Sequence, residues 1–252
     1  MLASTIHDDR IPLVLLHPFP FDSRFWEPQV VRFASERPVL TLDLPGFGES
    51  EKLPGEPSLD RWADAVAETV EAAFGGMPVV LGGLSMGGYI ALRLAARHPD
   101  LLEALVLADT RAEADPPEGR AARDEAIEAV HRDGVEPLVE ALLPTIIAPD
   151  SPPEVWDRAR EIALDQTPEA VADALAAMRD RPDSLAAMER LDVPVLVLVG
   201  EADGRTPRPM AEAMARAART SWLVTIPGAG HLASLEAPAA FDAALAGFLA
   251  AL

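Results

Sequence analysis

Six short apolar runs recur along the chain, and they constrain the fold more than any other feature of the sequence. The runs are rich in Val, Leu and Ile, are bounded by Pro, Gly or Asp, and lack the polar alternation of a half-exposed strand. They cover residues 11–16, 39–42, 79–81, 105–108, 195–199 and 222–226. Runs of this kind are typical of strands buried on both faces, so the sequence predicts an α/β fold with a mostly parallel central sheet flanked by helices.

The segments between these runs have helical periodicity. Helices are predicted over residues 59–74, 86–98, 207–218 and 238–252. Pro207 and Pro238 stand where the first turn of a helix tolerates a missing N–H. Strands that alternate with helices in this way favour crossover connections within a single sheet.

One long stretch interrupts the alternation. Residues 109–183 contain no strand-like run, and four helices are predicted there, over residues 118–131, 137–143, 153–165 and 168–181. The stretch holds 19 acidic residues and eight arginines, a net charge of −11. We predict that residues 109–185 form a helical lid, or cap, over the carboxyl edge of the sheet, where open α/β sheets bind ligands. Residues 1–108 and 186–252 then form the core.

Composition excludes several classes of function. The 252 residues include no cysteine, which rules out thiol catalysis and cysteinyl metal sites. The net charge of −20 disfavours nucleic acid as a partner. No apolar run approaches the roughly 18 residues of a membrane span, and residues 1–10 lack the pattern of a signal peptide. We therefore expect a cytoplasmic protein with no membrane partner, as a monomer or small homo-oligomer.

The strongest chemical signal is Gly83-Leu84-Ser85-Met86-Gly87, which directly follows a predicted strand and opens a predicted helix. A serine on such a sharp turn projects its hydroxyl above the sheet, and the crowded turn requires glycine on both sides of it. This context predicts that Ser85 is a nucleophile.

A serine nucleophile requires a base that titrates near neutral pH, and the chain has five histidines. His7 lies near the N-terminus, His98 ends a helix, and His131 lies in a solvated helix of the predicted lid. His231 follows the last strand in a glycine-rich loop at the carboxyl edge, so we predict that His231 is the base.

The imidazolium formed during catalysis requires a carboxylate that fixes its tautomer and stabilises its charge. Asp203 and Asp109 both follow strands at the correct edge of the sheet. The order Ser85, Asp203, His231 matches the order of nucleophile, acid and base in enzymes with a serine elbow, so Asp203 is favoured. Asp109 remains the alternative acid, with anchoring of the lid as its other possible role.

Two backbone N–H groups are predicted to hold the oxyanion of the tetrahedral intermediate. One belongs to Met86, which follows the nucleophile. The other belongs to Phe19, because Pro18 and Pro20 in the same loop have no N–H. His17 is interpreted as a structural residue that braces this loop.

As a set, the serine elbow, the His17-Pro18-Phe19-Pro20 loop, the turn over residues 43–50, Asp203 and His231 resemble the α/β-hydrolase superfamily. Within that superfamily, the chain looks most similar to the small bacterial esterases and enol-lactonases. The resemblance implies a triad of Ser85, Asp203 and His231, a lid after the sixth strand, and no metal or organic cofactor. In two respects the chain departs from the family: Pro18 stands where glycine is common, and only ten residues precede the first predicted strand, so the initial strands are expected to be short or missing.

Large apolar residues are candidates for the substrate pocket, which is usually apolar. They are Phe21, Trp26, Leu143, Ile146, Trp156 and Met178, with Phe19, Phe25 and Leu142 considered beside them. Arg111 is a candidate fork for a substrate carboxylate, although a structural pair with Asp115 or Glu113 is favoured. The acidic lid favours neutral substrates.

These observations predict a serine hydrolase that cleaves small carboxylic esters or lactones through an acyl-enzyme intermediate. The same triad also supports a cofactor-free perhydrolase or haloperoxidase, or a hydrolase of carbon–carbon bonds. A ligand-binding or signalling protein that retains the fold with negligible turnover is the alternative from a different class.

Overall fold

The computed structural model describes residues 10–252, and its centre is a sheet of six parallel strands in the order β2-β1-β3-β4-β5-β6. The strands are β1 (Leu13–Leu16), β2 (Val39–Leu42), β3 (Val79–Leu84), β4 (Leu102–Ala108), β5 (Val195–Gly200) and β6 (Ser221–Ile226). All six predicted runs are strands, and the α/β prediction is confirmed. The expected shortening of earlier strands concerns residues 1–9, which lie outside the described residues.

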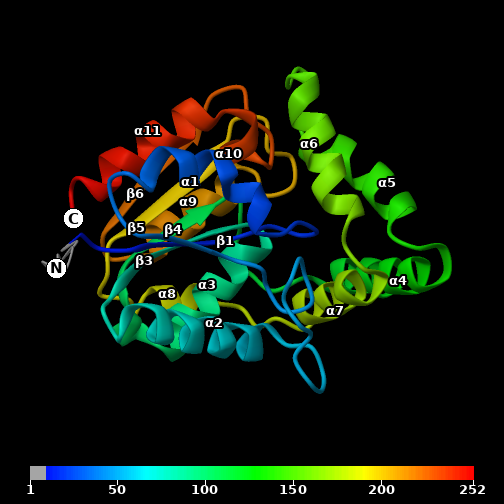
Figure 1. The fold of residues 1–252 in the computed structure, drawn as a ribbon, viewed down its shortest axis with the longest axis horizontal. Helices are drawn as coiled ribbons and strands as arrows, with labels where there is room; N and C mark the ends of the chain where they lie inside the picture. Colours follow the sequence, from blue (N-terminus) through cyan, green and yellow to red (C-terminus); the bar gives the residue numbers. More distant parts are fainter. Residues whose placement is uncertain (1–9) are drawn as a thin grey trace, which may run out of the picture.

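Helices cover both faces of the sheet (Figure 1). On one face lie α1 (Glu27–Phe33), α10 (Ala233–Glu236) and α11 (Pro238–Leu249); the other carries α2 (Leu59–Phe74), α3 (Met86–Arg97) and α8 (Leu185–Met188), with α9 (Arg208–Ala217) in contact with α8. Two short 3-10 segments, η1 (Ser23–Trp26) and η2 (Pro99–Leu101), precede α1 and β4. This double cover explains why β1, β3 and β5 are buried along their whole length.

Four helices are inserted between β4 and β5: α4 (Pro117–Asp133), α5 (Glu136–Ile146), α6 (Pro153–Leu164) and α7 (Pro168–Arg179). The resemblance places the insertion after a sixth strand, whereas within residues 10–252 it follows the fourth, β4. In Figure 1 these helices lie to the right of the sheet, beyond the ends of its strands, with α4 against α7 and α5 against α6. None of the described helices is long and apolar enough to span a bilayer.

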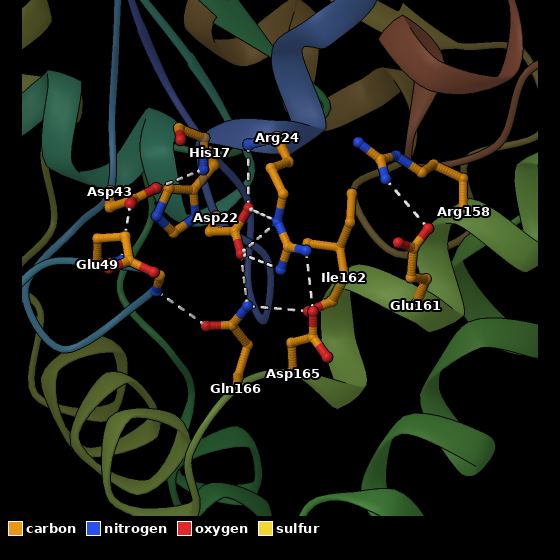
Figure 2. A network of polar contacts seen from close by, with 12 residues as sticks. His17, Asp22, Arg24, Asp43, Glu49, Arg158, Glu161, Ile162, Asp165 and Gln166 are labelled. Carbon is orange, nitrogen blue, oxygen red and sulfur yellow. Dashed lines mark hydrogen bonds and ion pairs between the residues drawn. The ribbon is translucent and has the colours of Figure 1, made fainter.

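A network of polar contacts fastens this insertion to the loops of the core (Figure 2). The carboxylate of Asp22, which is 1% exposed, accepts a hydrogen bond from Nε2 of Gln166 at 2.8 Å and pairs with Arg24 at 2.7 Å. Arg24 also reaches Asp165 at 2.9 Å, and Oε1 of Gln166 accepts the backbone N–H of Gly48 at 3.2 Å. Because Gln166 joins the loops after β1 and β2, the segment between α6 and α7 is held at the carboxyl edge.

Candidate active site

Ser85 occupies a strained turn between β3 and α3. Its φ of 52° and ψ of −111° lie outside the regions that non-glycine residues favour. A Cβ at Gly87 would lie 2.1 Å from the carbonyl oxygen of Leu16, and one at Gly83 would lie 2.2 Å from the carbonyl oxygen of Gly87. Both positions therefore require glycine, and the turn holds the partly exposed Ser85 side chain at the end of the central strand.

The three residues predicted as a triad lie in contact with one another. Nε2 of His231 is 2.9 Å from Oγ of Ser85, and Nδ1 of the same ring is 2.9 Å from Oδ2 of Asp203. The side chains of His231 and Asp203 are almost completely buried. The imidazole therefore bridges the hydroxyl and the carboxylate in the geometry that proton transfer from serine requires.

Asp203 is held in its ionised form. Its Oδ1 accepts the backbone N–H groups of Arg205 at 2.8 Å and Thr206 at 3.0 Å, and its Oδ2 accepts the hydroxyl of Thr206 at 2.6 Å. Although burial opposes ionisation, the hydrogen bonds from His231 and Thr206 lower the pKa of Asp203 to about 2. Because an ionised carboxylate only accepts hydrogen bonds, Nδ1 of His231 must carry the hydrogen, which leaves Nε2 free to receive the proton of Ser85.

The alternative acid, Asp109, has a different set of partners. It is completely buried with a φ of 43°, and it accepts the N–H groups of Gly200 at 2.7 Å and Ala233 at 3.0 Å. Burial, followed by the charge of Asp203, raises the pKa of Asp109 well above its usual range. Asp109 thus joins the end of β5 to the start of α10, while Asp203 is the acid that contacts the imidazole.

The carboxylate of Glu236 accepts hydrogen bonds from the loop that carries His231. The sequence did not predict this role for Glu236. Its Oε2 accepts the N–H of Gly230 at 3.0 Å and its Oε1 accepts the N–H of Leu232 at 2.9 Å, so both neighbours of His231 are fixed. The same Oε2 accepts the N–H of Ala148, at the end of α5, at 2.8 Å. This one carboxylate therefore ties the loop that carries the imidazole to the inserted helices.

We expect Glu236→Gln to lower kcat by about 10- to 100-fold, because the amide replaces one of the two acceptor oxygens and lets the imidazole shift. Steady-state kinetics should show the loss in kcat rather than in KM. Glu201→Gln is the matched control, since within residues 10–252 the exposed carboxylate of Glu201 accepts only the N–H of Gly228, at 2.9 Å. Equal effects of the two substitutions would contradict a positioning role for Glu236.

The two predicted oxyanion donors are available to a ligand. Met86 is the first residue of α3, where a helix leaves its N–H groups without intrahelical acceptors. Within residues 10–252 the N–H of Phe19 has no protein acceptor either. Both groups are therefore free to bind an oxyanion.

His17 braces the loop that carries Phe19. Its Nδ1 donates to the carbonyl oxygen of Pro18 at 3.0 Å, and its Nε2 accepts the N–H of Leu44 at 3.0 Å. Complete burial lowers the pKa of His17 to about 4, so the ring is neutral at physiological pH. These contacts fit a structural residue and leave no ring nitrogen free for catalysis.

A cavity of about 320 Å³ adjoins the site, although Ser85, Asp203 and His231 are not among its lining residues. Phe19, Tyr89 and Thr206 line it together with residues of α4, α5 and α7. Tyr89 lies one turn along α3 from Ser85, and its N–H donates to the carbonyl oxygen of Ser85 at 3.1 Å. The cavity therefore lies between the inserted helices and residues next to the triad, since Thr206 contacts both Asp203 and His231.

The predicted pocket residues do not line this cavity. The six are Phe21, Trp26, Leu143, Ile146, Trp156 and Met178, and none of them is among its lining residues. Phe21 and Trp26 are fully buried and pack against Phe25 and Phe241, because large aromatic rings fill the core under η1 and α1. Leu143, Ile146 and Met178 are buried in the same hydrophobic cluster, against which Trp156 packs. Phe19 and Leu142 do line the cavity.

Arg111, which was considered as a ligand for a substrate carboxylate, forms an ion pair with Asp115. This is the structural role that the sequence analysis favoured. Across residues 10–252 no group of three or more His, Asp or Glu side chains is arranged to hold a metal ion.

Known proteins resemble this chain over nearly its whole length. A model of the alpha/beta hydrolase family matches residues 13–244. A pimeloyl-[acyl-carrier protein] methyl ester esterase of Neisseria meningitidis is 32% identical over 237 residues, which cover 91% of this chain and 73% of that protein.

Two solved structures extend the comparison. A thermophilic esterase from Thermogutta terrifontis, solved with malate bound, is 38% identical with a TM-score of 0.92, covering 96% of this chain and 90% of that one. An enol-lactonase from Burkholderia xenovorans LB400 is 25% identical with a TM-score of 0.88, covering 98% and 94%. The chain therefore belongs to the alpha/beta hydrolase family. Within that family it is a hydrolase related to bacterial esterases.

Proposed function

We propose that the protein is a serine hydrolase that cleaves small carboxylic esters or lactones through an acyl-enzyme intermediate. One observation carries the proposal: the imidazole of His231 lies 2.9 Å from the hydroxyl of Ser85 and 2.9 Å from the carboxylate of Asp203. This arrangement supplies a nucleophile, a general base and an orienting anion in one connected line.

The reaction begins when Oγ of Ser85 attacks the ester carbonyl and its proton passes to Nε2 of His231. The carbonyl oxygen becomes an oxyanion held by the N–H groups of Phe19 and Met86, and each donor contributes about 3 to 4 kcal/mol to transition-state stabilisation. The carbon–oxygen bond to the leaving alcohol then breaks, and the imidazolium donates its proton to that alcohol. The product of this half-reaction is an ester of Ser85.

Water completes the cycle by the same route. His231 removes a proton from water, the resulting hydroxide attacks the acyl carbon, and the second tetrahedral intermediate collapses with release of the acid and return of the proton to Oγ of Ser85. Throughout, the charge of Asp203 stabilises the imidazolium, because the low pKa of its carboxyl keeps it ionised.

The inserted helices have the role of a lid in this proposal. Residues 109–185 form the outer wall of the cavity through α4, α5 and α7, and residues 10–108 and 186–252 supply the sheet and the triad. The relatives give further support for ester cleavage, since two of those compared are esterases and a third is an enol-lactonase.

Partitioning of the acyl group tests the proposal. The purified protein is given esters of one acid with several alcohols, together with hydroxylamine, and the ratio of hydroxamate to free acid is measured. A common acyl-enzyme requires the same ratio for every alcohol. A ratio that changes with the alcohol would contradict the intermediate, and failure to cleave any ester or lactone in the panel would contradict the function.

A further inference from the structure

The cavity that Phe19, Tyr89 and Thr206 line carries positive charge in a strongly acidic protein. Arg111, Arg123 and Arg205 line it, and Asp115 is the only acidic residue among its lining residues. The chain as a whole has a net charge of −20. A local excess of arginine at the cavity is thus opposite in sign to the rest of the molecule.

The single carboxylate of Asp115 contacts three arginines, so it cannot neutralise all of their positive charge. Its buried carboxylate contacts Arg111, Arg123 at 2.5 Å and Arg181 at 2.9 Å. Although burial opposes ionisation, hydrogen bonds from Arg181 and Arg123 lower the pKa of Asp115 to about 2, so it contributes one negative charge. The Nε atoms of Arg111 and Arg181 are buried, and within residues 10–252 neither has a hydrogen-bond acceptor. Asp115 and the three arginines around it therefore retain a net positive charge, and two of their N–H donors have no acceptor among the described residues.

Arg205 adds a further cation to the lining of the cavity. Its backbone N–H donates to Oδ1 of Asp203 at 2.8 Å, which fixes this residue beside the triad. Over the part of the chain that the structure describes, no carboxylate lies within ion-pair distance of its guanidinium. Desolvation, together with the like charges of Arg123 and Arg111, lowers the pKa of Arg205 against the opposing effects of Tyr89 and Asp203, although the residue as a whole is exposed.

We propose that this cavity binds a carboxylate of the substrate, with Arg205 as its principal ligand and Arg123 and Arg111 supplying the surrounding positive potential. The protein's substrates are then esters or lactones that carry a second, ionised carboxyl group, such as half-esters of short dicarboxylic acids. This inference rests on the proposed function and narrows its substrate class. It replaces the expectation of neutral substrates, because a charged group responds to the arginines that line its own cavity more strongly than to the distant acidic surface of α4–α7.

A matched pair of substrates tests the proposal. Methyl hydrogen adipate carries a carboxylate, and methyl adipamate replaces it by a neutral amide of nearly the same shape. A second pair, 4-acetoxybutanoate and 4-acetoxybutanamide, places the same difference on the alcohol side. For the wild type we expect kcat/KM to be at least about tenfold higher for the charged member of one pair, mainly through a lower KM.

Arg205→Gln should reduce that charged-to-neutral ratio by about 10- to 100-fold, and Arg205→Lys should retain part of it, because lysine keeps the charge but not the planar fork. Arg190→Gln is the matched control, since Arg190 is also exposed but lies outside the cavity. Its ratio should equal that of the wild type. Ratios near one in both pairs, or an unchanged ratio in Arg205→Gln, would overturn the proposal.

A binding measurement distinguishes the carboxylate subsite from the hydrolase function on which this inference rests. Calorimetric titration of Ser85→Ala with the same compounds measures recognition without turnover. Tighter binding of the carboxylate, lost on adding Arg205→Gln, supports the subsite even if no ester is cleaved. Equal binding of carboxylate and amide contradicts the subsite even if esters are cleaved.

Discussion

Replacing Asp203 by asparagine is expected to lower kcat by about 10,000-fold, because the amide stabilises the wrong tautomer of His231. In the wild type the ionised carboxylate requires a hydrogen on Nδ1 of His231, 2.9 Å away. Asparagine offers an N–H in place of one oxygen, so the ring turns its hydrogen towards Ser85 and Nε2 no longer accepts the serine proton. Initial rates with a chromogenic ester measure the loss.

Asp109→Asn is the matched comparison for this change. Asp109 lies in the same part of the fold, but it accepts the N–H groups of Gly200 and Ala233 and does not contact the imidazole. An amide nitrogen that faces one of these N–H groups costs about 1 to 3 kcal/mol of folding free energy. We therefore expect a lower Tm with much of the activity retained. Loss of activity in Asp109→Asn with a normal Asp203→Asn would transfer the acid's role to Asp109.

Ser85→Ala has the largest expected effect, a fall in kcat of about a million-fold, because removal of the nucleophile removes the acyl-enzyme route altogether. The residual rate comes from the oxyanion donors and substrate binding alone. Since His231 is the only hydrogen-bond partner of the Ser85 hydroxyl among the described residues, the fold should survive the change, and circular dichroism checks this.

Ser234→Ala is the control for serine removal near the site. The hydroxyl of Ser234 is buried, and among the described residues it has no hydrogen-bond partner. We expect kcat within about threefold of the wild type, in line with the small effect of deleting an unused hydroxyl. Comparable activity in Ser85→Ala and the wild type would show that another group performs the chemistry.

Much of the fold could be predicted because its strands are buried on both faces. The apolar runs mark β1 to β6 within a few residues, and the prolines mark the starts of α9 and α11. The helix α1 was not predicted, because its seven residues include Pro28 and follow directly on η1. Strands β3 and β4 are longer than predicted. Gly82 and Gly83 interrupt the apolar pattern but pair in the sheet, and Glu103 lies at a register shift between the two strands.

Residues of the site could be predicted where a short segment of the sequence forms a recognisable motif. Ser85 lies in such a segment, and the chain offers few histidines from which to choose a base. Glu236 and Arg205 could not be found in this way, because Glu236 binds Ala148 and Arg205 lines a cavity together with Arg123, and both of these residues lie far away in sequence. The residues that line the cavity could not be singled out from the sequence for a related reason. Apolar side chains that line a cavity and those that fill a core have the same composition, and only tertiary packing separates Phe19 from Phe21.

Reaction with a fluorophosphonate, followed by peptide mass spectrometry, tests the central claim most directly. Such a reagent modifies only a serine whose proton a neighbouring base can remove. At pH 7.5 we predict one phosphonyl group per chain, on Ser85, with modification abolished in Ser85→Ala and at least about 100-fold slower in His231→Gln. An unmodified wild-type protein, or a phosphonyl group on a different residue, would contradict the account.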